Sequence, residues 1–158
     1  MYHFLDRPVT TLDAGGRFLI WAMRSWVKVM GERSCPGTAI AYAFGRWNVI
    51  AGLQPFLRIM ALFNRHGLET FQFCALQCNH VSEHEAILLS LVCDLRDAEP
   101  QAIRDTLAML IEEDQIGELI AALTVLGRSL ERGGILPRRG AWLPQPLRPA
   151  PTRGQTRQ

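Results

Sequence analysis

Apolar residues recur at spacings of three and four along most of this chain, and this periodicity constrains the fold more than any other feature. The clearest stripe consists of Leu19, Met23, Trp26 and Met30, and Val27 widens it. Residues at this spacing lie on one face of an α-helix, because the helix repeats every 3.6 residues. The pattern therefore predicts a helical protein whose helices bury one face each.

Glycine and proline divide the chain into helix-length segments, because both residues interrupt helices. We expect helices over residues 12–30, 38–53, 55–66, 83–96, 100–113 and 116–132. Phe71 and Phe73 alternate with polar residues, which favours a short extended segment over residues 68–76. The expected fold is a single all-α domain, a bundle of five to six helices with one short extended segment. An irregular lead-in (residues 1–11) precedes the helical domain (12–136), and a flexible Pro/Arg-rich tail (137–158) follows it.

The sequence also predicts which helix is central and how the first helix presents its basic residues. The segment 38–53 is rich in alanine and glycine, which allow close helix approach, so we expect it to be the central helix. On the first helix, Arg17, Arg24 and Lys28 lie four to seven residues apart. This basic strip is typical of a solvated face, with an anion or partner contact as the alternative.

Composition limits the classes of protein. A chain of 158 residues with 48% apolar residues suits one globular domain. It contains no apolar run of membrane-spanning length and no visible signal peptide, so we expect a cytoplasmic protein that does not enter a membrane. In that compartment its four cysteines are thiols or metal ligands rather than disulfides. They are Cys35, Cys74, Cys78 and Cys93.

The net charge of +2 conceals an uneven distribution. The residues before Pro137 include 12 basic and 15 acidic side chains, whereas five arginines and no acid follow it. The body is therefore a poor surface for nucleic acid, and a phosphate contact could come only from the tail. We expect the tail to have no dedicated role, with a peptide-like ligand or a phosphate contact as alternatives.

A dense group of metal-ligand residues lies in the middle of the chain, within eleven residues. It consists of Cys74, Cys78, His80 and His84. Zinc accepts two thiolates and two imidazoles tetrahedrally, so these four residues are the candidate metal site, with zinc or iron as the metal. The two pairs almost overlap, unlike familiar zinc sites, whose pairs are separated by a longer loop. Packed thiols and surface histidines are therefore the alternative.

A predicted helix start divides this segment. Ser82 and Glu85 have the spacing of a capping box, which places His80 before the helix and His84 in its first turn. His80 to His84 also matches H-x-x-E-H, but that protease motif needs both histidines on one helical face, which the cap prevents. The helix N-terminus would favour a thiolate on Cys74 or Cys78. No other catalytic signature is present, so we expect no enzymatic activity.

Several of these features resemble a small, uncharacterised family of bacterial all-helical proteins, a domain of unknown function. The resemblance rests on residues 19–24, the Gly/Ala-rich helix, the cysteine-containing segment and the capped helix start at 82–86. It covers roughly Leu12 to Leu130. It implies that Cys74 and Cys78 belong to the common pattern, and it implies no catalytic role.

Three functional hypotheses follow. The first is a helical binding or regulatory module that contacts a protein partner or a second copy of itself. The second is a metal-binding protein with its site at residues 74–84. The third is a redox switch formed by the two thiols.

Overall fold

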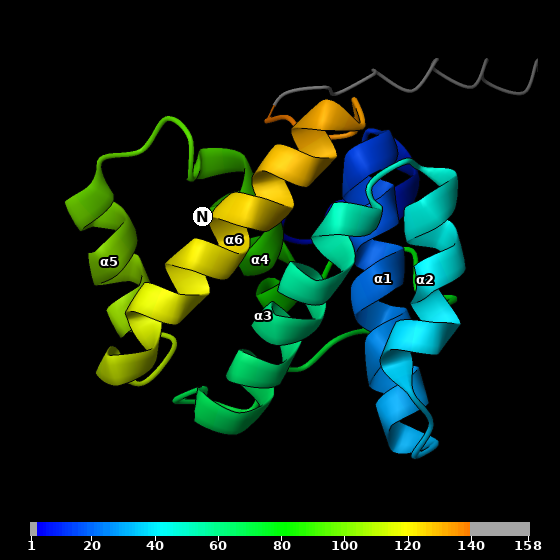
Figure 1. Ribbon diagram of the computed structural model, residues 1–158, viewed down its shortest axis with the longest axis horizontal. Coiled ribbons are helices and arrows are strands. Elements are labelled where there is room, and N and C mark those ends of the chain that lie inside the picture. The colour runs from blue at the N-terminus through cyan, green and yellow to red at the C-terminus, as the bar shows by residue number, and fades with distance from the viewer. Residues whose placement is uncertain (1–2, 140–158) are drawn as a thin grey trace, which may run out of the picture.

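A computed structural model describes residues 3–139 and confirms the all-α fold (Figure 1). Its helices are α1 (Ala14–Gly31), α2 (Pro36–Arg46), α3 (Leu53–His66), α4 (Glu83–Asp94), α5 (Pro100–Ala108) and α6 (Ile116–Arg132). Of three single turns of 3₁₀ helix, η1 (Val9–Thr11) precedes α1, whereas η2 (Ile50–Gly52) and η3 (Glu113–Gln115) lie between helices. Within residues 3–139, no helix has the length and apolar character to cross a membrane.

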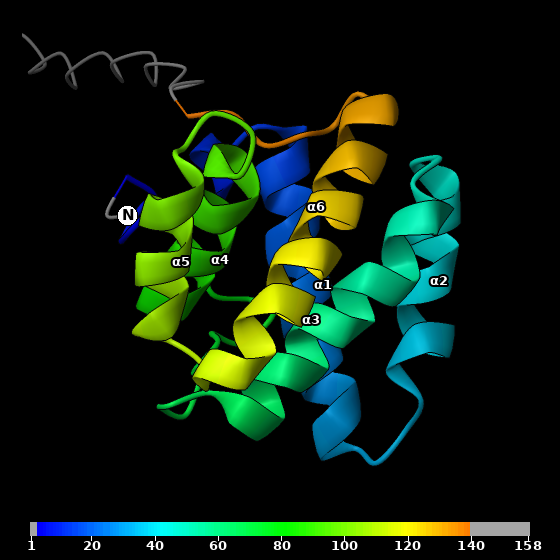
Figure 2. The ribbon, with the colours of Figure 1, turned by 60° about the vertical axis from the view of Figure 1, so that its left-hand side comes forward.

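The helices enclose α4, which is the central helix. Figure 1 shows α3 and α6 crossing in front of it, the α1–α2 hairpin on one side and α5 on the other, and Figure 2 shows α4 beside α5. Eight of the twelve residues of α4 are buried, whereas α2 buries only Ile40 and Phe44. The prediction of a central helix at 38–53 is therefore wrong. The small residues of α2 are half-buried or exposed, and Ala41 and Ala43 pack at the edge of the core. In contrast, α4 is apolar around most of its circumference, as an enclosed helix must be.

The predicted helix starts agree with the structure better than the ends do. Asp13 caps α1, since its side chain accepts a 2.7 Å hydrogen bond from the Gly16 amide. The second helix ends at Arg46 rather than near residue 53, because Asn48 adopts a left-handed conformation (φ 56°) that interrupts the helix. Pro55 lies in the first turn of α3, where its missing amide proton costs no helical hydrogen bond.

The first helix differs from its prediction at three positions. Arg24 is only 3% exposed, so the expectation of a solvated basic strip is wrong at this residue. Val27 and Met30, expected in the buried stripe, are 38% and 43% exposed. The buried face is therefore rotated towards Arg24, and the far end of the apolar stripe reaches the surface.

The lead-in contributes to the core although η1 is its only helical element among the described residues. Phe4 is buried. The Asp6 amide donates to the Val81 carbonyl (3.1 Å), the Val81 amide to the Arg7 carbonyl (3.0 Å) and the Val9 amide to the Asn79 carbonyl (2.9 Å). The lead-in thus pairs with the loop that precedes α4.

The segment 68–76 is extended but irregular. The described residues contain no strand, only two isolated bridges, Pro8 with His80 and Gly67 with Ile111. Phe71 packs against Phe63 of α3, with ring centroids 4.3 Å apart. Side-chain packing, rather than strand pairing, therefore holds this segment against the bundle.

The chain crosses the start of α1 as it leaves α6. The Arg138 amide donates to the Asp13 carboxylate (2.9 Å), and Arg139 forms an ion pair with Asp94. The remainder of the predicted tail, residues 140–158, lies outside the described residues.

We expect Gly15→Ala to destabilise the fold by about 1–3 kcal/mol, the usual cost of overpacking. A Cβ atom on Gly15 would lie 1.8 Å from the Ile135 carbonyl oxygen, so backbone would have to move. Gly127→Ala in α6 is the matched control, because its Cβ meets nothing within 4 Å. That variant should gain about 0.5–1 kcal/mol from helix propensity. Urea denaturation measures both changes, and equal free energies of unfolding for the two variants would contradict the close packing at Gly15.

Candidate functional site

A buried ion pair joins α1 to α4. The Arg24 Nε atom donates to Glu85 Oε1 (2.7 Å) and its Nη2 atom to Glu85 Oε2 (2.9 Å). The Arg24 side chain is 2% exposed and that of Glu85 is 0% exposed. Two parallel hydrogen bonds fix the orientation of both groups, which is the strongest geometry that an arginine–carboxylate pair offers. The hydrogen bonds that Arg24 donates to Glu85 also hold the pKa of Arg24 above its usual value.

Arg24 also holds the loop that carries the cysteines. Its Nη1 atom donates to the carbonyls of Ala75 (3.1 Å) and Cys78 (2.5 Å), and its Nη2 atom donates to the carbonyl of His80 (2.7 Å). With the two bonds to Glu85, the guanidinium therefore makes five hydrogen bonds. A planar, permanently charged group with five donors suits this arrangement, and lysine could not reproduce it.

Glu85 fixes the same loop from the other side. Its Oε1 atom accepts from the Cys74 amide (3.3 Å) and its Oε2 atom from the Ser82 amide (2.8 Å). The second bond belongs to the capping box of α4, which the structure confirms. One carboxylate thus caps the central helix and neutralises the buried arginine. Residues 74–82 are consequently held at both ends and in the middle.

The thiols of Cys74 and Cys78 lie together on this loop and differ in acidity. Burial, and then a hydrogen bond with Cys78, raises the pKa of Cys74 to about 11. Hydrogen bonds from the His80 backbone and then from Cys74 lower the pKa of Cys78 below its ordinary value of 9.0. The nearby Arg24 guanidinium adds to this effect. At neutral pH the thiolate therefore forms preferentially at Cys78, and Cys74 stays protonated.

The two histidines have other surroundings. The His84 Nδ1 atom accepts a hydrogen bond from the Gln72 amide (3.1 Å), and its ring lies 4.5 Å from the ring of Phe71. His80 is exposed, and its carbonyl serves as an acceptor for Arg24. The loop thus brings the two thiols together, and it uses the histidines for packing and for a backbone contact.

No group of three or more His, Cys, Asp or Glu side chains is arranged to hold a metal ion anywhere in residues 3–139. Binding of zinc or iron by Cys74, Cys78, His80 and His84 stays a prediction, and it would require both imidazoles to move towards the thiols. The observed capping box is consistent with the argument against a metalloprotease motif, since it leaves His80 outside α4.

The other two cysteines are separate from this loop. Cys35 is the exposed N-cap of α2, where hydrogen bonds from Thr38 lower its pKa. Cys93 is partly buried near the end of α4, and its Sγ atom donates to the Pro137 carbonyl (3.2 Å). Burial raises the pKa of Cys93 to about 12, so this thiol is the least acidic of the four for which a shift is seen.

Sequence reasoning did not identify Arg24 as part of the site, although its position among apolar residues points to it. Arg24 follows Ile20 by four residues and precedes Val27 by three, so it interrupts the apolar face. A charge in that position requires a buried partner, because an isolated buried ion is very costly. Glu85 was visible as a capping residue, but the sequence does not show that the cap faces α1.

No protein-family model, curated protein or solved structure matches this chain. The resemblance to an uncharacterised bacterial helical family therefore stays a prediction. The geometry of the loop is the basis for functional inference.

We expect Arg24→Met to destabilise the protein by about 3–5 kcal/mol, because it leaves the Glu85 carboxylate buried without its cation. The loop carbonyls lose their donors at the same time. Urea denaturation measures the global effect, and amide hydrogen exchange across residues 74–82 measures the local one.

Arg58→Met provides the matched control. Arg58 forms an ion pair with Glu118, and both side chains are exposed, so little stability should be lost. Unchanged exchange across residues 74–82 in Arg24→Met would show that the guanidinium does not hold the loop.

Proposed function

We propose that this chain is a regulatory helical module whose input is the oxidation of Cys74 and Cys78 to a disulfide. The observation that carries the proposal is the hydrogen bond between the two thiols on one short, fixed loop. The pKa is raised at Cys74 and lowered at Cys78. A thiolate-favouring cysteine beside a protonated one matches the requirements of a redox pair, in which one sulfur reacts and the other resolves.

A hydroperoxide is a suitable oxidant. The Cys78 thiolate attacks the peroxide oxygen, the O–O bond breaks, and the leaving alkoxide takes a proton to become an alcohol. Cys78 is now a sulfenic acid. The Cys74 sulfur then attacks the Cys78 sulfur, and its proton leaves with the hydroxyl group as water. In total, two thiols and one hydroperoxide give one disulfide, one alcohol and one water.

The surroundings of the loop offer a route from oxidation to a change in shape. The carbonyl of Cys78 accepts a hydrogen bond from Arg24, so movement of Cys78 alters this bond directly. The following residues, Asn79 and Val81, pair with the lead-in. A disulfide that repositions Cys78 would therefore also act on the N-terminal segment.

Treatment of the reduced Cys35→Ser protein with hydrogen peroxide should remove two hydrogen atoms, a mass loss of about 2 Da. Neither Cys74→Ser nor Cys78→Ser in that background should show this loss, and Cys78→Ser should also resist sulfenic-acid trapping. Cys93 stays in every variant as an internal control thiol. A disulfide that still forms without Cys74, or sulfenic acid that accumulates on Cys74, would contradict the assigned roles.

The pH dependence gives a second measurement on the same variants. Because the pKa of Cys78 is lowered and that of Cys74 is about 11, iodoacetamide should alkylate Cys78 first. The rate at Cys78 should level off at a lower pH than the rate at Cys74, which should still rise towards pH 11. Equal rates at both cysteines between pH 7 and pH 9 would contradict the asymmetry.

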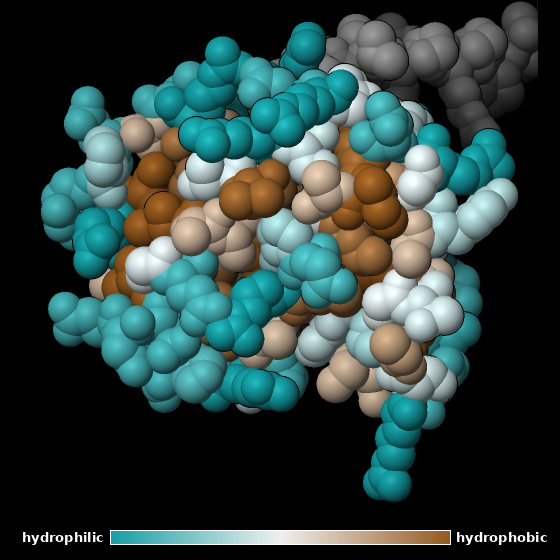
Figure 3. Space-filling view, in the orientation of Figure 1, coloured by the Kyte–Doolittle hydropathy of each residue, from teal (hydrophilic) through white to brown (hydrophobic). Residues whose placement is uncertain are grey.

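A second candidate function is contact with a protein partner through the outer surface of α1 and α2. Trp21 and Trp47 both lie beside Phe18, at centroid distances of 6.3 and 6.2 Å, and all three line an open hollow of about 330 Å³. Tyr42 is 74% exposed, and the guanidinium of Arg46 lies 6.0 Å from its ring centroid. Figure 3 shows apolar residues reaching the surface where α2 and α3 meet.

The chemistry of this surface favours an acidic partner with apolar side chains. Tryptophan, tyrosine and arginine are the residues that contribute most at protein interfaces. Neither α1 nor α2 contains an acidic residue, and both carry exposed arginines, Arg17 and Arg46. A complementary partner would place carboxylates near these arginines.

A photo-crosslinking amino acid in place of Tyr42 should crosslink to an acidic segment of one partner protein. Trp47→Ala should reduce the yield of this crosslink severalfold. The same label in place of Met109 is the matched control, because Met109 is exposed and lies at the C-cap of α5, outside the α1–α2 surface. Equal capture from both positions, insensitivity to Trp47→Ala, or capture only of a second copy of the chain would contradict an acidic partner here.

A further inference from the structure

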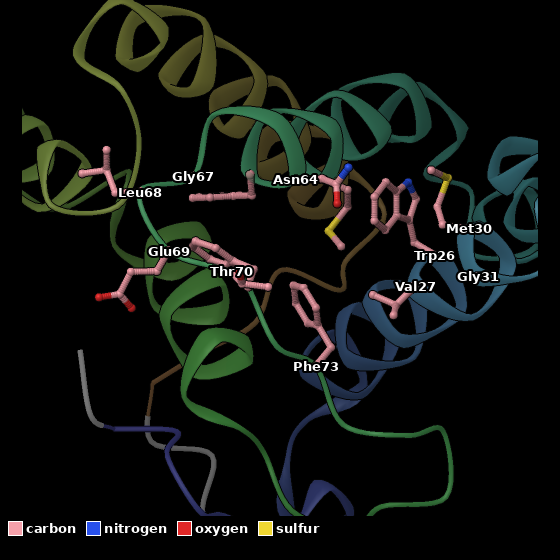
Figure 4. A pocket seen from close by; sticks show the side chains of 13 residues that line it. Trp26, Val27, Met30, Gly31, Asn64, Gly67, Leu68, Glu69, Thr70 and Phe73 are labelled. Atoms are coloured by element: carbon pink, nitrogen blue, oxygen red, sulfur yellow. The ribbon is translucent and has the colours of Figure 1, made fainter.

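An open pocket of about 560 Å³ lies between the C-terminal ends of α1 and α3 and the extended segment 68–73. Its volume falls in the range of small-molecule sites, about 300–1,000 Å³. Figure 4 shows the side chains of Trp26, Val27 and Phe73 around the open space, with Asn64 and Thr70 on other sides of it. The pocket therefore combines aromatic walls with a few polar groups, as small-molecule sites do.

The exposed apolar residues at this pocket lack a cover in the described structure. Val27, Met30 and Leu68 are 38%, 43% and 56% exposed, and all three line the pocket. Val27 and Met30 also continue the apolar stripe of α1, so their sequence pattern is that of buried residues. A bound apolar group would remove them from water, and methionine adapts to ligands of different shapes.

The charge of the lining selects among apolar ligands. Glu69 is the one charged residue among the lining residues, which include no Lys, Arg or His. Its carboxylate lies at the outer edge of the pocket, directed outward in Figure 4, and within residues 3–139 it forms no ion pair. A carboxylate at one edge of an aromatic interior favours cations over carboxylates, and aromatic faces add to the attraction of a cation.

We propose that this pocket binds a small aromatic or aliphatic amine, with its apolar end between Trp26 and Phe73 and its ammonium group at the rim beside Glu69. Neither Cys74 nor Cys78 lines this pocket. Its existence can therefore be tested on fully reduced protein, so that failure here and failure of the redox proposal are distinguishable.

The probes are 4-phenylbutylamine and 4-phenylbutanoate, which share the same apolar part and differ in charge. Methionine methyl groups, labelled with carbon-13, report binding by NMR. The amine should shift Met30 and Met60, which line the pocket, and leave Met109 unchanged, since it does not. For a ligand of this size we expect a Kd on the order of 1 mM. The carboxylate should bind about tenfold more weakly.

Two variants with one control locate the site. Val27→Trp fills the pocket from an exposed position and should abolish saturable shifts, whereas Val125→Trp, on the exposed face of α6, should leave the Kd unchanged. Glu69→Gln should weaken the amine by about threefold and remove the preference over the carboxylate. Thermal unfolding of each variant verifies that it is folded.

Several outcomes would overturn the proposal. These are the absence of saturable shifts at Met30 and Met60, equal affinity for the amine and the carboxylate, and binding that persists in a folded Val27→Trp protein. A shift of Met109 as large as that of Met30 would show non-specific binding and would overturn it as well.

Discussion

The burial of one arginine is the constraint on which the rest of the structure depends. Arg24 is almost completely buried, so the donors of its guanidinium must find acceptors inside the protein. Glu85 supplies the charge, and three carbonyls of the cysteine loop supply the remaining acceptors. The conformation of the loop is therefore determined largely by the requirements of a side chain on another helix. The same requirement keeps Cys74 and Cys78 together.

The sequence predicted the features that depend on local interactions. The all-α fold and the capping box at Ser82 both follow from residues a few positions apart, and the structure confirms both. Features that depend on distant partners were missed. The sequence does not show that Arg24 faces Glu85, because 61 residues separate them. The sequence also did not reveal which helix is central, because the small residues in α2 permit close packing without requiring it.

The pocket and the thiol pair share one structural element. Phe71 and Phe73 line the pocket, and Cys74 follows them directly. Phe71 also stacks against His84 in the first turn of α4. Packing at the pocket and hydrogen bonding at the loop therefore act on neighbouring residues of the same segment, which has no strand pairing to isolate one from the other. A change at either place has a short physical path to the other.

The separation of Arg24 and Glu85 also has a consequence for synthesis on the ribosome. Arg24 emerges 61 residues before its carboxylate partner. At roughly 5–20 residues per second, this interval lasts several seconds. During that time α1 carries an uncompensated cation on the face that it later packs against α4. The contact between these two helices therefore cannot form until α4 has been made and delivers the missing charge.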